Sequence, residues 1–156
     1  MASLLYESIY SSLLRKITDY DIARMVDSDA EIIQTEYLHS AVSKPYTRRL
    51  FSSLSMNDEL QEMEYTLYQI TDESQDNDFV IEMLALGMLI EWLEPQLNSK
   101  LLTQQMITSS KESKWYSQQQ HLSTIQSIYD SAVKKQRNLI LDRGFIYNDY
   151  LGGTNG

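Results

Sequence analysis

The sequence predicts an all-α fold: a small helical bundle with a long C-terminal helix and an extended C-terminal arm. Two observations favour this fold class. Side chains that commonly cap helices recur along the chain, and apolar residues follow them at helical spacing. No comparable run stands out with the period of two that a half-buried strand shows. The length of 156 residues suits one domain around a single core.

Capping patterns indicate where four of the expected helices begin. In each pattern a hydroxyl precedes an acidic residue by three positions, so that both side chains can satisfy free N–H groups of the first turn. The patterns are Thr18-x-x-Asp21, Ser28-x-x-Glu31, Ser55-x-x-Asp58 and Ser109-x-x-Glu112. Together with the breaks between them, they predict helices over residues 3–16, 19–26, 29–42, 57–70, 78–93, 96–106 and 111–142.

Apolar stripes support three of these helices. An amphipathic helix repeats its apolar residues every three or four positions. The stripes comprise Ala30, Ile33, Tyr37 and Ala41 in the 29–42 helix, Leu60, Met63, Leu67 and Ile70 in the 57–70 helix, and residues from Leu122 to Ile140 in the last helix. The last stripe is the longest, so we expect a long C-terminal helix.

The most apolar stretch runs from Phe79 to Leu93 and contains Glu82 and Glu91. It is shorter than the roughly 20 residues that a bilayer requires, so we expect a helix buried in protein and no membrane segment. The two glutamates lie on opposite sides of this helix, so at least one of them must be paired or else face a subunit boundary or channel. Gly87 indicates a close helix crossing. Pro95 predicts a break after residue 94 and a new helix from residue 96.

Beyond the last helix, Arg143-Gly144 resembles a helix stop, and the tail has no helical period. We therefore expect residues 1–144 to form the helical domain and residues 145–156 to form a C-terminal arm. Aromatic and apolar side chains of the arm and of the start of the last helix are candidate interface anchors, because Tyr and Trp are enriched at interface hot spots. They are Trp115, Tyr116, Phe145, Tyr147, Tyr150 and Leu151. The alternative is that they cover the end of the bundle.

The net charge of −9 is unevenly distributed. Residues 50–99 hold 11 acidic and no basic side chains, whereas residues 100–143 hold seven basic and three acidic ones. One interpretation is a solvated acidic surface. The other is a head-to-tail contact, in which the acidic middle of one subunit faces the basic last helix of the next and builds a ring or filament. Candidate channel or inter-subunit charges are Asp58, Glu59, Glu62, Lys134, Lys135 and Arg137.

Signatures of catalysis and of cofactor binding are missing from the sequence. The chain has no cysteine, and its two histidines, His39 and His121, lack the spacing of metal ligands or of a nucleophile pair. Glycine-rich phosphate motifs and nucleophile-elbow motifs are also missing. His39 lies opposite the apolar stripe of its helix, which predicts an exposed side chain. We expect no enzymatic activity, no cofactor and no metal site. The net negative charge disfavours sequence-independent binding to nucleic acid.

One segment resembles a calcium-binding loop. Asp72-x-Ser74-x-Asp76-x-Asp78 offers oxygen atoms at alternate positions, as an EF-hand loop does. Asn77, however, stands where that loop needs glycine, and the position that needs glutamate is occupied by methionine. We therefore expect a polar loop in which Asn77 or Asp78 caps the next helix.

Three stretches together resemble head–tail connector (adaptor or neck) proteins of tailed bacteriophages. They are residues 84–102, with a buried helix that ends in Trp92-Leu-Glu-Pro95, residues 110–122, with the step Trp115-Tyr-Ser117, and residues 133–147, with a long helix that ends in Arg143-Gly-Phe145. The likeness covers roughly residues 77–150, about half of the chain. The first half of the chain departs from these proteins because it is longer and more acidic, and the resemblance assigns no role to residues 1–56.

This resemblance implies a structural virion protein without enzymatic activity. Proteins of this family assemble as a homo-oligomeric ring, here expected to be a dodecamer, beneath the portal protein at the capsid–tail junction. The ring extends the DNA channel, lets DNA pass without specific binding, and docks the next neck or tail-completion protein. Assembly in the host cytoplasm and the absence of a membrane partner follow from the same resemblance. The arm from Phe145 onwards is expected to reach a neighbouring ring.

Three other functions remain open at the level of sequence. An acidic regulatory protein that mimics DNA would present carboxylates at phosphate-like spacing on one face. A host helical adaptor would bind one partner through the end of the bundle that carries Trp115 and Tyr116. An enzyme would need turnover that depends on a residue such as His121.

Overall fold

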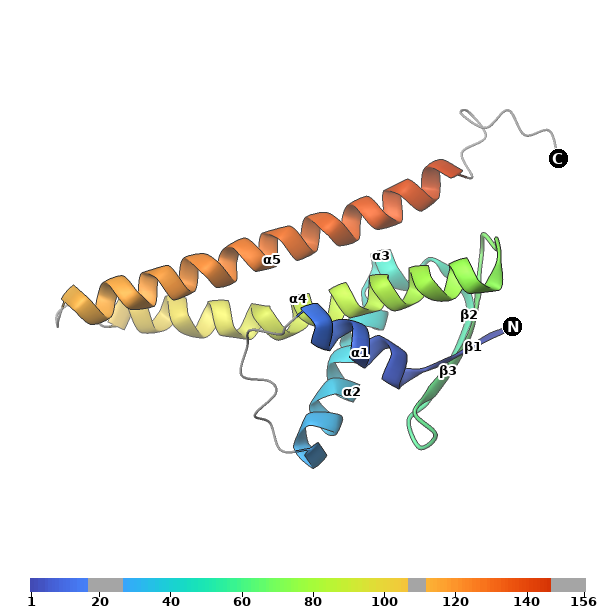
Figure 1. Cartoon of the computed structure of the whole chain (residues 1–156), viewed down its shortest axis with the longest axis horizontal. Helices are drawn as coiled ribbons and strands as arrows, with labels where there is room; N and C mark the ends of the chain where they lie inside the picture. Colours follow the sequence, from blue (N-terminus) through green and yellow to red (C-terminus); the bar gives the residue numbers. More distant parts are fainter. Residues whose placement is uncertain (17–26, 107–111, 147–156) are drawn as a thin grey trace.

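A computed structural model describes residues 1–16, 27–106 and 112–146 of the chain (Figure 1). The elements follow in the order β1 (Ala2–Leu5), α1 (Tyr6–Lys16), α2 (Asp27–Ser43), α3 (Pro45–Arg48), β2 (Phe51–Asn57), β3 (Glu62–Leu67), α4 (Glu73–Met106) and α5 (Glu112–Ile146). Helices dominate these residues, but three strands form an antiparallel sheet in the order β1-β3-β2. The prediction of an all-α fold is therefore wrong, and the fold is mixed.

The expected helix over residues 57–70 is instead a turn and the strand β3. Side chains of β3 alternate between the two faces of the sheet: Met63, Tyr65 and Leu67 are buried, whereas Glu64 is exposed. This is the period of two that a half-buried strand requires. Some apolar residues of this segment fit both a helical stripe and a strand. Pairing with β1 and β2 selects the strand.

The two ends of the expected stripe show why the helical interpretation fails. Leu60 and Ile70 are each 63% exposed, since they lie in the turns that flank β3. The capping pattern that begins at Ser55 belongs to the hairpin: Ser55 pairs with Glu64 in the ladder between β2 and β3. A capping pattern alone therefore does not separate a helix start from a strand that enters a tight turn.

The first expected helix, over residues 3–16, begins three residues later than predicted. Residues Ala2–Leu5 extend the sheet, with Leu4 opposite Met63. Leu4 is buried, and the neighbouring Leu5 is half exposed, as the alternation of a strand demands. The expected helix over residues 19–26 lies outside the described residues. The helix expected over residues 29–42 corresponds to α2.

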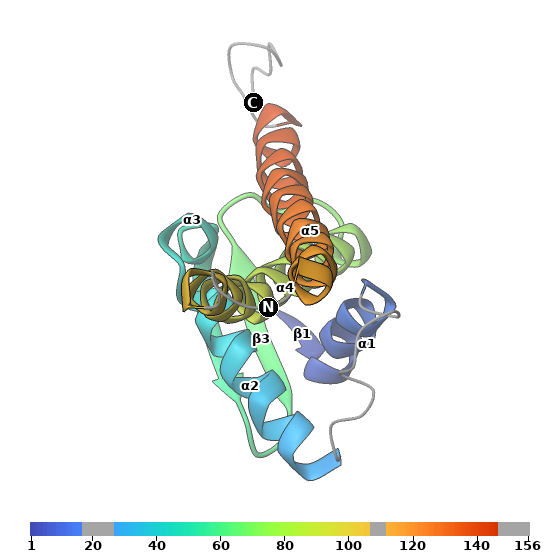
Figure 2. The same ribbon diagram turned by 90° about the vertical axis from the view of Figure 1, so that its left-hand side faces the viewer.

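Helix α4 is the centre of the molecule. It contacts α1, α2, α5 and β1, and every residue from Met83 to Ile90 is buried. Figures 1 and 2 show α5 running along α4, with α1 and α2 on the opposite side of α4 from α5. The prediction of a buried helix around Phe79–Leu93 is confirmed. None of the described helices is long and apolar enough to cross a membrane.

The predicted break at Pro95 is wrong, because α4 continues through this residue to Met106. Proline inside a helix removes one hydrogen bond and costs about 3 kcal/mol. The packing of α5 along α4 offsets this cost, since the two helices share more contact than any other pair of elements. One long helix therefore replaces the two that the sequence predicted.

Gly87 confirms the expected close crossing. A Cβ atom at this position would lie 3.0 Å from the Cβ of Ala41 in α2 and 3.0 Å from Nε2 of Gln136 in α5. Gln136 is buried, and its Nε2 donates a hydrogen bond of 3.1 Å to the carbonyl oxygen of Met83. Glycine thus lets three helices meet at one level of α4.

The two glutamates of α4 are both paired, on different flanks of the helix. Glu82 accepts from Nζ of Lys16 in α1 at 2.8 Å. Glu91 accepts from Nζ of Lys44, just before α3, at 3.0 Å. The hydrogen bond from Lys44 to Glu91, with their attraction, raises the pKa of the Lys44 ammonium. The expectation that at least one glutamate is paired is therefore confirmed for both.

A buried ion pair ties the end of α5 to the start of α4. Arg143 donates to Asp76 at 2.7 Å and to the carbonyl oxygen of Gln69 at 2.6 Å, and its guanidinium lies 4.5 Å from the centre of the Phe79 ring. Burial alone would raise the pKa of the Asp76 carboxyl, but hydrogen bonds from Thr71 and Arg143 outweigh it and hold this pKa below its ordinary value.

The segment that resembles a calcium loop is thus part of α4 and its start. The helix begins at Glu73, so the expectation that Asn77 or Asp78 caps it is wrong. Asn77 instead accepts a hydrogen bond from the Tyr65 hydroxyl. The described residues contain no group of three or more side chains able to hold a metal ion.

The predicted stop at Arg143-Gly144 is also wrong, because α5 continues through both residues to Ile146. The expected boundary between the domain and the arm at residue 145 therefore falls inside the helix. Arg143 is held against Asp76, and this anchor keeps the last turns of α5 on the body of the protein. Residues 147–156 of the expected arm lie outside the described residues.

Replacing Gly87 should destabilise the protein. In Gly87→Val the new side chain meets Ala41 and Gln136 at contact distance, and overpacking of this kind costs about 1–3 kcal/mol. Denaturant unfolding followed by circular dichroism measures the loss. Asn138→Ala, an exposed change on α5, is the control and should leave the free energy of unfolding within about 0.5 kcal/mol. Equal stability of the two variants would contradict the crossing.

Asp76→Asn should lower the free energy of unfolding by about 3 kcal/mol at pH 7, because it leaves the buried guanidinium of Arg143 without its counter-charge. The pKa of Asp76 is lowered in the folded state, so its contribution is complete above the ordinary carboxyl pKa and is lost as the pH falls through the lowered value. When urea unfolding is measured between pH 7 and 2, the free energy of unfolding of this variant should therefore fall less with decreasing pH than that of the unaltered protein. The exposed Asp72→Asn serves as the control.

Candidate assembly surfaces

An apolar groove lies between α3, α4 and α5. It has a volume of about 460 Å³. Apolar side chains of α4 and α5 line it, and the exposed side chains of Tyr46 and Leu141 lie at its edge. Its lining comprises Lys44, Tyr46, Arg49, Ile90, Glu91, Glu94, Tyr129, Val133, Gln136, Arg137, Ile140 and Leu141. We call these residues the α3–α5 groove.

Charges are arranged unequally in the α3–α5 groove. Lys44 and Glu91 neutralise each other. Arg49 and Arg137 are exposed, and no ion pair or hydrogen bond to another described residue occupies either guanidinium. Burial raises the pKa of the Tyr129 hydroxyl, and the nearby Glu94 adds to this shift. The groove therefore offers apolar surface together with two arginines that are available to an anion.

A second exposed feature is the turn between β2 and β3, residues 58–61, which we call the hairpin turn. Leu60 is 63% exposed in it, and Glu59 is exposed beside Leu60. Gln61 adopts a positive φ of 53°, a conformation that non-glycine residues adopt only in tight turns or under strain. The hairpin turn thus projects a leucine and a carboxylate into solvent.

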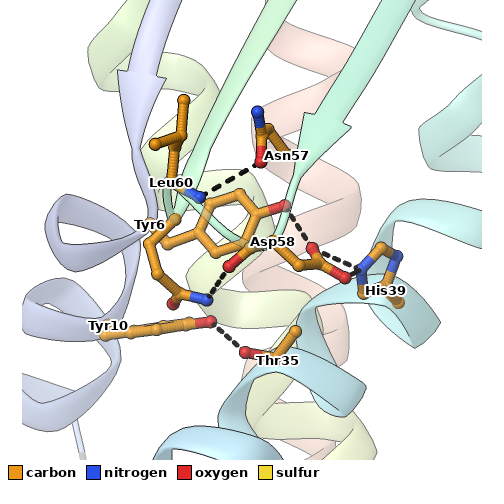
Figure 3. Close-up of polar contacts among 8 residues, drawn as sticks. Tyr6, Tyr10, Thr35, His39, Asn57, Asp58 and Leu60 are labelled. Carbon is orange, nitrogen blue, oxygen red and sulfur yellow. Dashed lines mark hydrogen bonds and ion pairs between the residues drawn. The ribbon is translucent and has the colours of Figure 1, made fainter.

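Hydrogen bonds hold the hairpin turn in one shape (Figure 3). The Tyr6 hydroxyl donates to Asp58 at 2.7 Å, and the ring of His39 contacts both oxygens of the same carboxylate at 2.9 Å. Asn57 accepts from the backbone N–H of Leu60 at 3.1 Å. These side chains come from α1, α2 and β2, so the turn is fixed to three elements of the body.

These contacts also set the titration of the cluster. The hydrogen bond from Tyr6, followed by the contact with His39, holds the pKa of the Asp58 carboxyl below its ordinary value. Burial, with the carboxylate as acceptor, raises the pKa of the Tyr6 hydroxyl well above its ordinary value. A hydroxyl with a raised pKa is a poor base or nucleophile. The Tyr6–Asp58–His39 cluster is therefore arranged to fix the turn and not to activate a nucleophile.

The side chains of the candidate channel or inter-subunit charges lie within the described residues. Lys134, Lys135 and Arg137 are exposed on α5, and of these only Arg137 lines the α3–α5 groove. Asp58 is occupied by Tyr6 and His39, whereas Glu59 is exposed and Glu62 is half-buried. The exposure predicted for His39 is confirmed, since 45% of its side chain is accessible.

The aromatic candidates stay predictions. Trp115, Tyr116 and Phe145 lie in α5, but their side chains fall outside the described residues. The side chain of His121 does so as well. Tyr147, Tyr150 and Leu151 lie outside the described residues altogether.

Sequence reasoning missed most of the α3–α5 groove and the role of the hairpin turn. Leu141 is far from Tyr46 and Arg49 in the sequence, and only the folded arrangement of α3, α4 and α5 brings the three residues to one groove. No local pattern connects them. The hairpin turn was open to detection, because Met63, Tyr65 and Leu67 alternate with polar residues directly after the turn-forming Asn57-Asp58.

Tyr6→Phe should raise the pKa of the Asp58 carboxyl toward its ordinary value, because it removes the first hydrogen bond that stabilises the carboxylate. Carboxyl chemical shifts followed by NMR during an acid titration measure this change. Tyr10→Phe is the matched control, since its hydroxyl contacts Thr35 and not Asp58. An unchanged pKa of Asp58 in Tyr6→Phe would show that the hydrogen bond from Tyr6 to Asp58 does not form.

Comparisons of the chain with protein-family models, with curated proteins and with solved structures find no match. The surfaces described above are therefore interpreted from their own geometry and chemistry.

Proposed function

We propose that this chain is a head–tail connector of a tailed phage. In this proposal the chain assembles as a ring, expected to be dodecameric, under the portal protein at the capsid–tail junction. The ring extends the DNA channel and docks the next neck or tail-completion protein. It acts through its surfaces and performs no chemistry.

One observation carries the proposal. The three stretches that resemble connector proteins, residues 84–102, 110–122 and 133–147, fall almost entirely within the long antiparallel pair α4 and α5. This pair contains the buried centre of the fold and the close crossing at Gly87. The resemblance therefore concerns the part of the chain on which the packing depends, not a peripheral segment.

The surfaces of the chain agree with an assembly role. The hairpin turn carries an exposed leucine and a carboxylate, and the α3–α5 groove carries apolar surface and two available arginines. A contiguous apolar surface rimmed by charges, as in the groove, is typical of protein–protein interaction sites. Complementary surfaces at two different places on one chain favour a head-to-tail contact, which builds rings when the rotation closes.

The acidic middle of the chain suits a DNA channel. Glu64, Asp72, Glu73 and Asp78 are exposed in the structure. Carboxylates repel phosphates, so a channel wall that bears them would let DNA slide without adhesion. This favours DNA as a passing partner and disfavours a sequence-independent DNA-binding role.

The test is assembly with a portal. The chain, co-expressed with the portal protein encoded in the same genome, should co-purify with it and form a ring on the portal axis in electron micrographs. Omitting the portal is the control for spontaneous rings, and an unrelated portal is the control for specificity. A chain that neither binds the portal nor occupies the capsid–tail junction of the virion would contradict the proposed function.

A further inference from the structure

We propose that neighbouring copies are joined by insertion of the hairpin turn of one copy into the α3–α5 groove of the next. Leu60 enters the apolar part of the groove, and Glu59 meets Arg49 and Arg137. The inference rests on the proposed function, since it names the contact that would build the ring, and it makes a second copy of this chain the occupant of the groove.

The hairpin turn has the properties of an anchor. Leu60 is 63% exposed although it is a large apolar residue. The turn is held before any partner arrives, through the bonds of Asp58 to Tyr6 and His39 and the bond from the Leu60 N–H to Asn57. A preorganised anchor loses little conformational entropy on binding, so that more of the contact energy is available for affinity.

The α3–α5 groove matches this anchor in size and polarity. Ile90, Val133 and Ile140 contribute its apolar lining, and a volume of about 460 Å³ has room for a leucine side chain with its flanking backbone. Leu141 is 59% exposed at its edge, which leaves apolar surface in water when nothing is bound. When Leu60 enters the groove, the apolar surfaces of both are removed from water, which favours the contact.

Charge favours the same pairing. The hairpin turn bears Glu59, which is exposed and lies in a stretch with no basic residue. The groove bears Arg49 and Arg137, which are available, and Lys44, which is already paired with Glu91. Glu94, the remaining carboxylate of the groove, lies close to Tyr129. A carboxylate that enters the groove beside the arginines is therefore attracted by two positive charges.

The positions of the two surfaces suit a ring. The hairpin of β2 and β3 leads from the side of α3 to the hairpin turn, and in Figure 1 this turn lies below α4, whereas α5 lies above it. Strand β2, Phe51–Asn57, spans roughly 20 Å at about 3.3 Å per residue. Surfaces so far apart on one chain cannot satisfy each other within it, and each is free to contact a different neighbour.

Cysteine cross-linking tests the contact directly, because the natural chain contains no cysteine. Leu60→Cys and Leu141→Cys are exposed changes that should fold normally. The two variants, purified separately and then mixed with a short bismaleimide, should give a covalent dimer that neither variant gives alone. Leu60→Cys mixed with Leu14→Cys, an exposed position on α1 outside the groove, is the matched control and should remain uncross-linked.

The outcomes separate this contact from the proposed function. Rings on the portal without the Leu60–Leu141 cross-link would overturn the contact and leave the connector function standing. A chain that stays monomeric at all concentrations and on the portal would overturn both. Equal cross-linking to Leu14→Cys would indicate random collision and would also overturn the contact.

A charge exchange gives an independent test. Glu59→Arg and Arg137→Glu should each weaken self-association about tenfold or more, because each places like charges in the contact. The double variant should regain most of the affinity, as measured by analytical ultracentrifugation. Glu64→Arg, a change on the exposed face of β3 away from the turn, controls for net charge. Failure of the double variant to recover would argue against the pairing of Glu59 with Arg137.

Discussion

The burial of α4 on all sides is the constraint on which the rest of this structure depends. Eight consecutive residues, Met83–Ile90, have no substantial exposure, so α1, α2, α5 and the sheet must all reach the same helix. Three helices can approach at one level only because Gly87 has no side chain. The positions of α1, α2, α5 and β1 therefore follow from the need to cover α4 without a clash at this residue.

The charged side chains that α4 carries into its contacts are each paired with an oppositely charged side chain of a neighbouring element. Glu82 and Glu91 leave α4 on different flanks, and each meets a lysine of a covering element. Asp76 is buried more deeply and takes an arginine, whose planar guanidinium bonds the carboxylate and a backbone carbonyl together. The ion pairs thus lie where α4 contacts its neighbours. They contribute more to the orientation of each neighbour than to the free energy of unfolding.

The sheet serves a different purpose from the helices. Its inner face adds Phe51 and Tyr65 to the core, where the rings pack edge to face and burial raises the pKa of the Tyr65 hydroxyl to about 12. Its far end carries the hairpin turn, which contacts α1 and α2. A hairpin held by side chains of α1 and α2 can present an exposed leucine without losing its shape, which is the physical basis for proposing it as the contact between copies.

The sequence by itself determined the helical elements that depend on local signals. The long apolar period of α5, the buried character of residues 79–93, the crossing at Gly87 and the pairing of the α4 glutamates could all be predicted, because helical spacing and the cost of burying charge are local or nearly local properties. The exposed position of His39 followed from the same spacing. The head-to-tail contact suggested by the separation of acidic and basic segments stays a prediction.

Only the tertiary structure decided the sheet, the continuity of α4 through Pro95 and the α3–α5 groove. A short run such as Met63–Leu67 fits two periods, and pairing with residues 2–5, almost sixty positions away, selects the strand. The proline is tolerated because α5 packs along α4. The groove unites Tyr46, Ile90 and Leu141, which no sequence pattern links, because the packing of helices and not the order of residues brings them together.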